Sequence, residues 1–467
     1  MRIEKNHSLL EKVKKQLFAF SMLRLFVFCL AAVSIYFAYG NTKLVIGIIM
    51  ITIVLFLLLV SKYTGLQYKR DRLNAIIDIN KTELEVLNRN FHHLPNGDSF
   101  KDPQHYFSQD IDLFGKGSFY QYANRTVLRE GGETLSEILT ENSIHNIEGK
   151  QKAISELSKL PEWRQNFQAI ASLSRSETDA KIIVKWLKSY STFVPSIMRY
   201  LPLIFSALSI GVATLYFLNV IAESFFLYWI LFGLLITLIF AKKMTKLGLD
   251  LSKTQATFEQ YNKLLLLIEE TDFSSDLLNQ KKDRILSNGE RTAVVLKEFS
   301  KLLSSLEQNN NFIFLIFGNG LFLRGLATCF KIENWIKSHG SAVENWFQII
   351  AFFDAYNSLG NFAFNHPDYV FPIILEKEGV LKAKQAGHPL LDPEKSVLND
   401  FEINTEEFFI ITGANMAGKS TFLRTVSLQI VMANIGLPVC AKSVSYAPMK
   451  LITSMRTTDS LTDDESY

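Results

Sequence analysis

The sequence predicts a multidomain protein in which α-helical membrane hairpins and an all-α region are followed by a partial α/β domain of the P-loop type. Three observations lead to this fold class. Uncharged apolar runs occur in two adjacent pairs, charged segments with helical periodicity flank them, and a G-x-x-x-x-G-K-[ST] motif lies between a predicted strand and a predicted helix. The 467 residues have room for two or three domains. The mean hydropathy of +0.12 is high for a soluble protein.

Four apolar runs carry no charge, and each is close to the ~20 residues that a helix needs to cross a bilayer. They are Leu25–Thr42 and Leu44–Ser61 in a first hairpin, and Tyr200–Ala222 and Ser224–Ala241 in a second. The alternative is that these runs form buried core helices. For the first run, a signal peptide is a further alternative. A signal peptide fits poorly because no small-residue cleavage site precedes the second run.

Basic residues gather on one side of both hairpins, whereas the opposite turns hold only Lys43 and Glu223. The flanking basic residues are Lys12, Lys14, Lys15, Arg24, Lys62, Lys69, Arg70, Arg72, Lys185, Lys188, Arg199, Lys242, Lys243 and Lys246. This positive-inside bias predicts a multi-pass protein of a bacterial-type inner or cell membrane, with both termini and the large polar segments cytoplasmic. Since no charge lies within a span, the hairpins are predicted to be anchors in the lipid bilayer, with no ion pathway.

A third apolar run, Phe312–Leu323, is too short to span a bilayer and ends at Arg324. Its length predicts a buried core helix, with a re-entrant segment as the alternative. Residues 242–309 carry eleven Lys/Arg against ten Asp/Glu, which predicts solvated helices. The segment lacks the one-sided basic stripe of a DNA-gripping surface, so charge gives no support for DNA as a partner.

The pattern changes near Val380 to short β-rich runs around one strong helix. The helix is predicted over Lys419–Ala433 and closed by Gly436 and Pro438. The predicted strands are the runs FEIN, FFIITG, SVSYAP and LITSM, which begin at residues 401, 408, 443 and 451.

The motif GANMAGKS starts at Gly413 and follows the predicted strand directly. Glycines allow backbone N–H groups to turn towards phosphates, and a helix N-terminus adds partial positive charge. Lys419 is predicted to reach the β- and γ-phosphates of a nucleotide, and the Ser420 hydroxyl to bind Mg²⁺. The alternative is a glycine-rich turn with a surface lysine.

Five stretches resemble the MutS family of DNA mismatch-repair proteins, whose phosphate loop carries Asn-Met in this way. They are ITGANMAGKSTFLRTV within Phe408–Val426, AGHPLL at Ala386–Leu391, VLND at Val397–Asp400, FDAYNSLGNFAF at Phe353–Phe364, and the run Asp112–Leu139. The resemblance covers about residues 105–200 and 310–467. It implies a helical core and lever region, then an ABC-type ATPase domain that dimerises to form two composite ATP sites.

The resemblance assigns site residues by position. For ATP and Mg²⁺, these are Gly413, Ala414, Asn415, Met416, Ala417, Gly418, Lys419, Ser420 and Thr421, with Ser420 on the metal. Lys419 is the catalytic lysine, and Ser466, in TTDSLTDDESY, matches the serine that reaches the partner's ATP in trans; a polar loop residue is the plainer interpretation of Ser466. The family's adenine-stacking aromatic is replaced here by Ser396, which puts the adenine contact in doubt.

Three departures from the family limit the resemblance. The first 100 residues hold a membrane hairpin and no Phe-x-Glu wedge, so mismatch recognition itself is not expected. The second hairpin interrupts the helical core. No apolar strand followed by Asp-Glu, the family's Walker B, comes after Lys419, so the sequence is interpreted as C-terminally truncated and hydrolysis by this chain is expected to be negligible.

The sequence thus predicts a membrane-anchored, MutS-like, homodimeric ATP-binding switch that lacks the mismatch-reading domain. A transporter-type membrane ATPase and a non-hydrolysing membrane scaffold with a MutS-like core are the alternatives, and DNA binding stays open in each. The predicted parts are a cytoplasmic segment (1–24), hairpin 1 (25–61), a helical region with the start of the core (62–199), hairpin 2 (200–241), a lever and core region (242–375) and the start of the ATPase domain (376–467).

Overall fold

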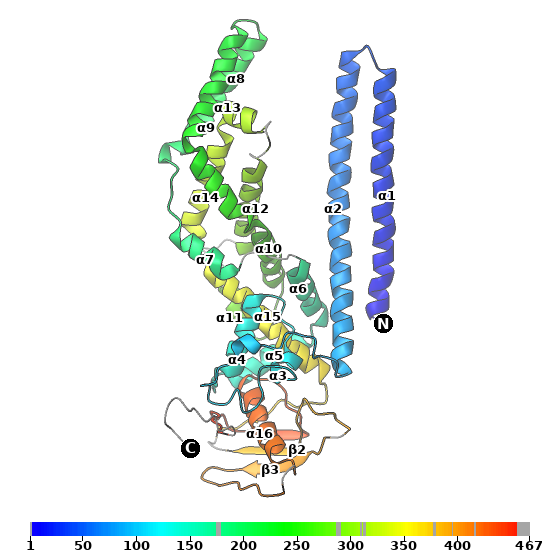
Figure 1. Cartoon of the computed structure of the whole chain (residues 1–467), viewed down its shortest axis with the longest axis vertical. Coiled ribbons are helices and arrows are strands. Elements are labelled where there is room, and N and C mark those ends of the chain that lie inside the picture. The colour runs from blue at the N-terminus through cyan, green and yellow to red at the C-terminus, as the bar shows by residue number, and fades with distance from the viewer. Residues whose placement is uncertain are drawn as a thin grey trace, which may run out of the picture. The chain divides into compact units, whose positions relative to one another are not determined.

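The computed structural model describes residues 2–173, 179–285, 291–308, 311, 314–376, 380–394, 396–414 and 417–454. The chain divides into two compact units (Figure 1). The first unit comprises Met1–Leu94 and Pro161–Leu173, and the second comprises Pro95–Leu160 and Ser174–Tyr467.

The first unit is a long helical hairpin with one short helix against it. Helix α1 covers Arg2–Phe37 and α2 covers Thr42–Leu87, and the Asn41 side chain caps α2 by accepting a hydrogen bond from the Leu44 N–H. At ~1.5 Å per residue, α2 is roughly 70 Å long, more than twice the ~30 Å hydrocarbon core of a bilayer. Its second half packs on the start of α1 through Leu10, Val13, Leu17, Leu73 and Ile77, and on α6 (Pro161–Leu173).

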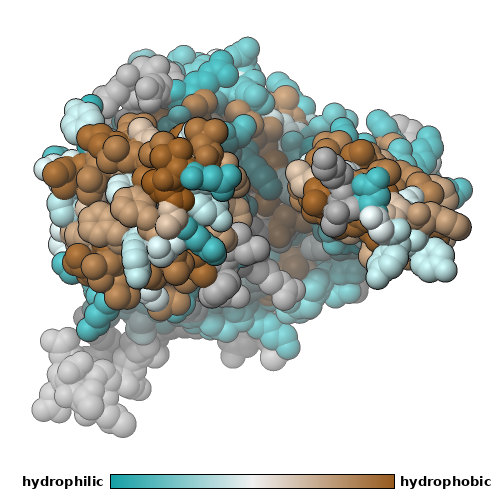
Figure 2. All heavy atoms as spheres, turned by 90° about the horizontal axis from the view of Figure 1, so that it is seen from above, coloured by the Kyte–Doolittle hydropathy of each residue, from teal (hydrophilic) through white to brown (hydrophobic). Residues whose placement is uncertain are grey.

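The other half of this hairpin is apolar and exposed. Seen from above in Figure 2, apolar side chains dominate the tips of both hairpins. Phe28, Phe37, Ile51 and Leu57 are all more than half exposed. Exposed apolar surface on this scale is typical of a lipid-facing or partner-facing segment.

Within the described residues, three helices have the length and apolar character needed to cross a membrane: residues Ile3–Phe37, Leu44–Leu87 and Glu223–Ser252. The third predicted span, Tyr200–Ala222, forms the shorter helix α8 over Leu201–Phe217, which is therefore not among the three. The chain leaves α8 at Asn219, whose φ of 57° is incompatible with a right-handed helix. Its partner α9 covers Glu223–Ser252.

The prediction of a buried core helix over Phe312–Leu323 is wrong. In the described part, π-helix η4 (Phe314–Gly318) leads into α13 (Asn319–Phe322), and α13 is bent by 80° against α14 (Arg324–His339). Phe314, Phe317 and Phe322 are 37–50% exposed. The bend follows from Leu323, which has φ 47° and is fully buried. This geometry fits a broken span or a re-entrant segment, the alternative left open by the sequence.

The helical core of the second unit surrounds α15 (Val343–Asn365), nearly all of which is buried. On α15, Ser358 Oγ donates a hydrogen bond to the Ala123 carbonyl at 3.0 Å. Just beyond the helix, His366 Nε2 lies 2.8 Å from Tyr122 Oη. The stretches around residues 112–139 and 353–364, which resemble the same family, therefore lie together. The remaining helices are η1 (Asp98–Phe100), α3 (Phe119–Ala123), α4 (Arg129–Thr140), α5 (Ile147–Ser158), α7 (Ala180–Ser189), η2 (Ser196–Arg199), α10 (Gln255–Glu269), α11 (Asp276–Asp283) and α12 (Thr292–Glu307).

A small mixed sheet follows the helical core, in the strand order β1-β4-β2-β3. Strand β1 is Ile373–Ile374, β2 is Leu381–Ala386, β3 is Asn399–Ile403 and β4 is Ser443–Tyr446. β1 pairs with β4 in parallel, and the β2 pairs are antiparallel. The runs FEIN and SVSYAP are thus confirmed as strand regions, and β2 is a strand that the sequence did not predict.

Two other predicted strands are wrong. The run FFIITG has no regular secondary structure, and Phe408 and Ile410 are 96% and 83% exposed. A strand with apolar residues on both faces is stable only between sheet neighbours and covering helices, and no described strand pairs with this run. The described part of LITSM, residues 451–454, is also irregular because its backbone bonds to a loop: the Thr453 N–H donates to the Tyr106 carbonyl.

Candidate nucleotide-binding site

The predicted phosphate loop leads directly into helix α16, which covers Lys419–Asn434 and confirms the predicted helix. Gly418 precedes the helix with φ 83°, a left-handed conformation that glycine adopts without strain. The Lys419 Nζ atom donates to the Gly413 carbonyl at 2.5 Å, so the lysine folds back over the loop. At its other end, Gly436 has φ 80° and Leu437 N–H donates to the Met432 carbonyl, which ends the helix as predicted.

The start of α16 offers unsatisfied donors. No side chain caps it, and its first intrahelical bond runs from the Phe422 N–H to the Gly418 carbonyl. The N–H groups of Lys419, Ser420 and Thr421 therefore have no acceptor within the helix. Ser420 and Thr421 are exposed, as are the loop residues Gly413, Ala414, Ala417 and Gly418. An anion can reach these donors from solvent, and the helix dipole favours it there.

Three of the predicted site residues, Asn415, Met416 and Ser466, lie outside the described residues. Ser396 lies near Gly387, the residue that follows strand β2. A Cβ atom added to Gly387 would be 3.6 Å from the Ser396 hydroxyl.

Two contacts hold the first turns of α16 against a loop of the helical core. Arg424 Nε donates to the Asp110 carbonyl at 2.9 Å, and its guanidinium lies 3.3 Å from Asp112 Oδ2. The Thr453 hydroxyl donates to the carboxylate of Asp110 at 2.6 Å. This link could not be predicted from the sequence because its partners are more than 300 residues apart; the only sequence signal is that they belong to stretches with the same family resemblance.

His388, in the stretch AGHPLL, lies close to the same link. Burial and the nearby Arg424 guanidinium lower its pKa to about 4, against an opposing effect of Asp112. The imidazole is therefore neutral at pH 7, and its Nδ1 accepts a hydrogen bond from the Leu390 N–H. The neutral ring therefore adds no positive charge beside Arg424 at pH 7.

The buried end of α16 is joined to the helical core as well. Lys150 Nζ donates to the Asn434 carbonyl at 3.3 Å, and Gln151 Nε2 donates to the Pro372 carbonyl at 2.9 Å. A Cβ on Gly436 would lie 2.6 Å from that of Lys150, so the turn after α16 fits closely on α5. Both ends of the helix that follows the phosphate loop thus touch the core.

Comparison with known proteins finds the family model "MutS domain V" over residues 409–467. The DNA mismatch repair protein MutS of Clostridium kluyveri is 31% identical over 229 residues, 46% of this chain and 25% of that protein. MutS of Chlorobaculum tepidum is 29% identical over 219 residues, 44% of the chain and 23% of the relative. MSH3 of Candida albicans is 35% identical over 121 residues, 24% of the chain and 12% of the relative. The matches thus span a quarter or less of these relatives.

The fold and the site define a mostly helical protein with candidate membrane spans, whose small mixed sheet accompanies a G-x-x-x-x-G-K-[ST] loop at the start of a buried helix. Both kinds of comparison match part of this chain to MutS proteins, which confirms the resemblance to the MutS family.

Proposed function

We propose that this chain is a membrane-anchored MutS-like protein that binds ATP and Mg²⁺ and acts as a dimeric switch. The observation that carries the proposal is the position of Lys419. Its ammonium already lies over the loop, on the Gly413 carbonyl, at an uncapped helix N-terminus inside the region that matches MutS domain V. Phosphate oxygens of ATP would replace that carbonyl as the partner of Lys419.

The other loop residues would bind the phosphate groups of ATP and its metal ion. The backbone N–H groups from Gly413 to Thr421 would surround the phosphates, and the Ser420 hydroxyl would bind Mg²⁺. Ser466 of a second copy is proposed to complete each site in trans, which makes the ATP-bound state a homodimer.

A change at the loop has a direct route to the helical core. Arg424 lies one helical turn after Ser420 and holds Asp110 and Asp112, while Lys150 holds the far end of α16. A shift of α16 on ATP binding would therefore move the core. The packing of α15 against α3, α4 and α5 would spread this movement through the core.

Membrane anchoring is proposed from the apolar surfaces of α1, α2, α8, α9 and α13, and cytoplasmic placement of the ATP site from the flanking basic residues. DNA is proposed as a candidate partner on the names of the relatives, which are DNA mismatch repair proteins. Binding of duplex or branched DNA that weakens steeply with salt would support this partner.

The test uses the full chain in nanodiscs and Mg·ATP titrated by calorimetry. Lys419→Ala is expected to weaken ATP binding at least tenfold, while Lys442→Ala, an exposed lysine of the same domain, keeps the wild-type affinity. Equal affinity of the Lys419→Ala variant and the wild type would overturn the ATP site. Anchoring is tested separately by alkaline carbonate extraction of membranes, from which the chain should not be released.

A further inference from the structure

Arg324 lies where two grooves of the second unit meet. It is the first residue of α14, immediately after the bend at Leu323. Its guanidinium donates to Gln308 Oε1 at 3.0 Å and to Ser305 Oγ at 3.5 Å, and lies 5.1 Å from the ring centre of Phe314. The side chain therefore touches polar groups of α12 on one side and an apolar ring of η4 on the other.

The first groove, here called the apolar groove, runs between the start of α8 and the segment η4–α13. Its walls are lined by Pro202, Leu203, Ser206, Phe314, Phe317, Gly318, Phe322, Arg324 and Ala327. Leu203 and Phe317 are 72% and 50% exposed, so their apolar surface is open to the surroundings. Apart from Ser206, Arg324 is the one polar side chain of this lining.

The second groove, here called the basic groove, lies between α10 and α12. It is lined by Glu259, Asn262, Lys263, Lys297, Ser300, Lys301, Ser304, Ser305, Gln308 and Arg324. Four cationic side chains thus face one carboxylate. Among the described residues no ion pair holds Lys297 or Lys301, and both are exposed. Burial lowers the pKa of Lys263, a cost that a nearby anion would offset.

The two grooves share Arg324, and they lie at the end of hairpin 2 that the flanking basic residues mark as cytoplasmic. Pro202 and Leu203 lie in the first turn of α8, close after Arg199, and the run of lysines at the end of the apolar part of α9 starts at Lys242. An apolar groove that continues into a basic one at a membrane boundary matches the chemistry of one ligand class, an apolar chain attached to an anionic headgroup.

We propose that the apolar and basic grooves together bind an anionic phospholipid of the bilayer. Its phosphate would lie on Arg324, Lys297 and Lys301, and one acyl chain would follow Phe314, Phe317 and Leu203. The proposal rests on the membrane insertion proposed above, and makes α12 together with Arg324 the part of the protein that recognises the membrane's charge.

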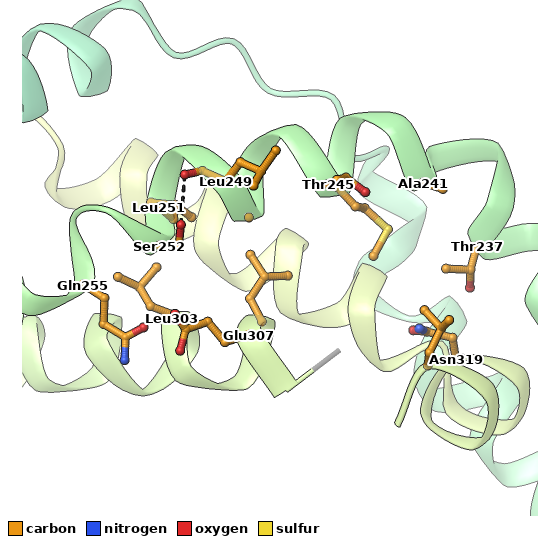
Figure 3. Close-up of a pocket in the computed structure, with 14 residues that line it drawn as sticks. Thr237, Ala241, Thr245, Leu249, Leu251, Ser252, Gln255, Leu303, Glu307 and Asn319 are labelled. Carbon is orange, nitrogen blue, oxygen red and sulfur yellow. Dashed lines mark hydrogen bonds between the residues drawn. The ribbon is translucent and has the colours of Figure 1, made fainter. Parts of the chain in front are cut away.

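A neighbouring cavity does not fit this ligand. It lies between α9, α12 and α13 and has a volume of about 180 Å³ (Figure 3). In Figure 3 Leu251 on α9 lies on one side of the cavity and Leu303 and Glu307 on α12 lie on the other. Glu307 is its only charged lining residue, so the cavity would repel an anionic headgroup. It is also below the ~300 Å³ of typical ligand pockets.

The experiment measures lipid retention on the full chain by native mass spectrometry from detergent. The probes are dioleoylphosphatidylglycerol and, as the zwitterionic control, dioleoylphosphatidylcholine. We expect the wild type to retain the anionic lipid at least fivefold better. The double variant Lys297→Ala/Lys301→Ala should bring this ratio near one, while Lys331→Ala/Lys337→Ala, which removes two exposed lysines of α14, should leave it unchanged. Phe317→Ser should lower retention of both lipids.

An unchanged ratio in the Lys297→Ala/Lys301→Ala variant would overturn the proposal. Displacement of the lipid by millimolar inorganic phosphate would reduce the site to one for a free anion, and displacement by a 20-base-pair duplex would make it a nucleic-acid surface; each also overturns it. Release of the chain from membranes by alkaline carbonate would contradict membrane anchoring. The ratio of the two lipids retained in detergent would still test the lipid-binding grooves in that case. Thermal unfolding midpoints equal to that of the wild type would confirm that the lysine variants fold.

Discussion

Gly233 of α9 and Gly320 of α13 meet backbone to backbone: a Cβ atom on Gly233 would overlap the carbonyl oxygen of Gly320. A Cβ on Gly320 would lie 2.7 Å from Cγ2 of Ile230, again on α9. Close contact of small residues is how helices pack within a membrane, where the hydrophobic effect does not drive them together. This pair fixes the bent segment η4–α13 against hairpin 2.

Gly233→Ala should therefore force α9 and α13 apart. Overpacking of this kind costs about 1–3 kcal/mol. The matched control is Gly248→Ala on the same helix, where an added Cβ meets nothing within 4 Å and should raise stability by up to about 1 kcal/mol through helix propensity. Thermal unfolding midpoints in detergent compare the two, and equal midpoints would show that the contact is not tight.

Stability should fall with rising pH because of Asp354. This carboxylate is fully buried, accepts hydrogen bonds from the N–H groups of Val127 and Leu128, and has its pKa raised to about 7 by burial. Between the unfolded value near 3.9 and about 7, the folded state holds a proton that the unfolded state has released. The free energy of unfolding should therefore decrease across this window, by roughly 4 kcal/mol in total.

The check is chemical denaturation at several pH values. Asp354→Asn keeps an acceptor for both N–H groups but does not titrate, so it should flatten the pH profile between pH 4 and 7. Asp368→Asn, at an exposed carboxylate, should retain the wild-type slope. If the free energy of unfolding of Asp354→Asn still falls between pH 4 and 7, another titratable group causes the pH dependence.

Removing Arg424 should loosen the link between α16 and the core. Its pair with Asp112 is a third to half exposed and contributes at most about 1 kcal/mol, and its bond to the Asp110 carbonyl adds a similar amount. Arg424→Met should thus cost about 1–2 kcal/mol and speed hydrogen exchange in α16. Lys382→Met, which breaks an exposed cross-strand pair with Glu402, should cost less than about 1 kcal/mol and leave α16 exchange unchanged.

The hydroxyl of Tyr446 anchors the sheet to the end of α16. It donates to Asn434 Oδ1 at 2.6 Å and accepts from the half-buried Met449 N–H at 3.1 Å, and Tyr446 and Asn434 are both buried. Tyr446→Phe removes this partner from the buried Asn434 Oδ1 and the half-buried Met449 N–H, which costs about 1–3 kcal/mol. Tyr106→Phe, at a 67% exposed tyrosine, should be close to neutral in the same denaturation experiment. A neutral Tyr446→Phe would mean that water replaces the hydroxyl.

The candidate site was partly predictable because its chemistry is local. Gly418, Lys419 and Ser420 are adjacent, and the helix that follows them forms from its own sequence and ends at Gly436. The strand before the loop was not predictable in the same way, since Phe408 and Ile410 need sheet neighbours that no described residue supplies. Strand β2 was missed although Leu381 and Ala383 point inward and Lys382 and Lys384 outward, because alanine and lysine have low β-propensity.

The sequence by itself determined the apolar helices, the phosphate-loop motif and the resemblance to the MutS family, because hydropathy and motif spacing are properties of neighbouring residues. Only the tertiary structure decided that residues 314–322 bend away from α14 at the left-handed Leu323 and pack on α9 through Gly320 and Gly233. It also decided that a segment with almost balanced charge gathers Lys263, Lys297 and Lys301 in one groove with Arg324. Net charge sums over a segment, whereas a ligand meets only the side chains that packing brings to one face.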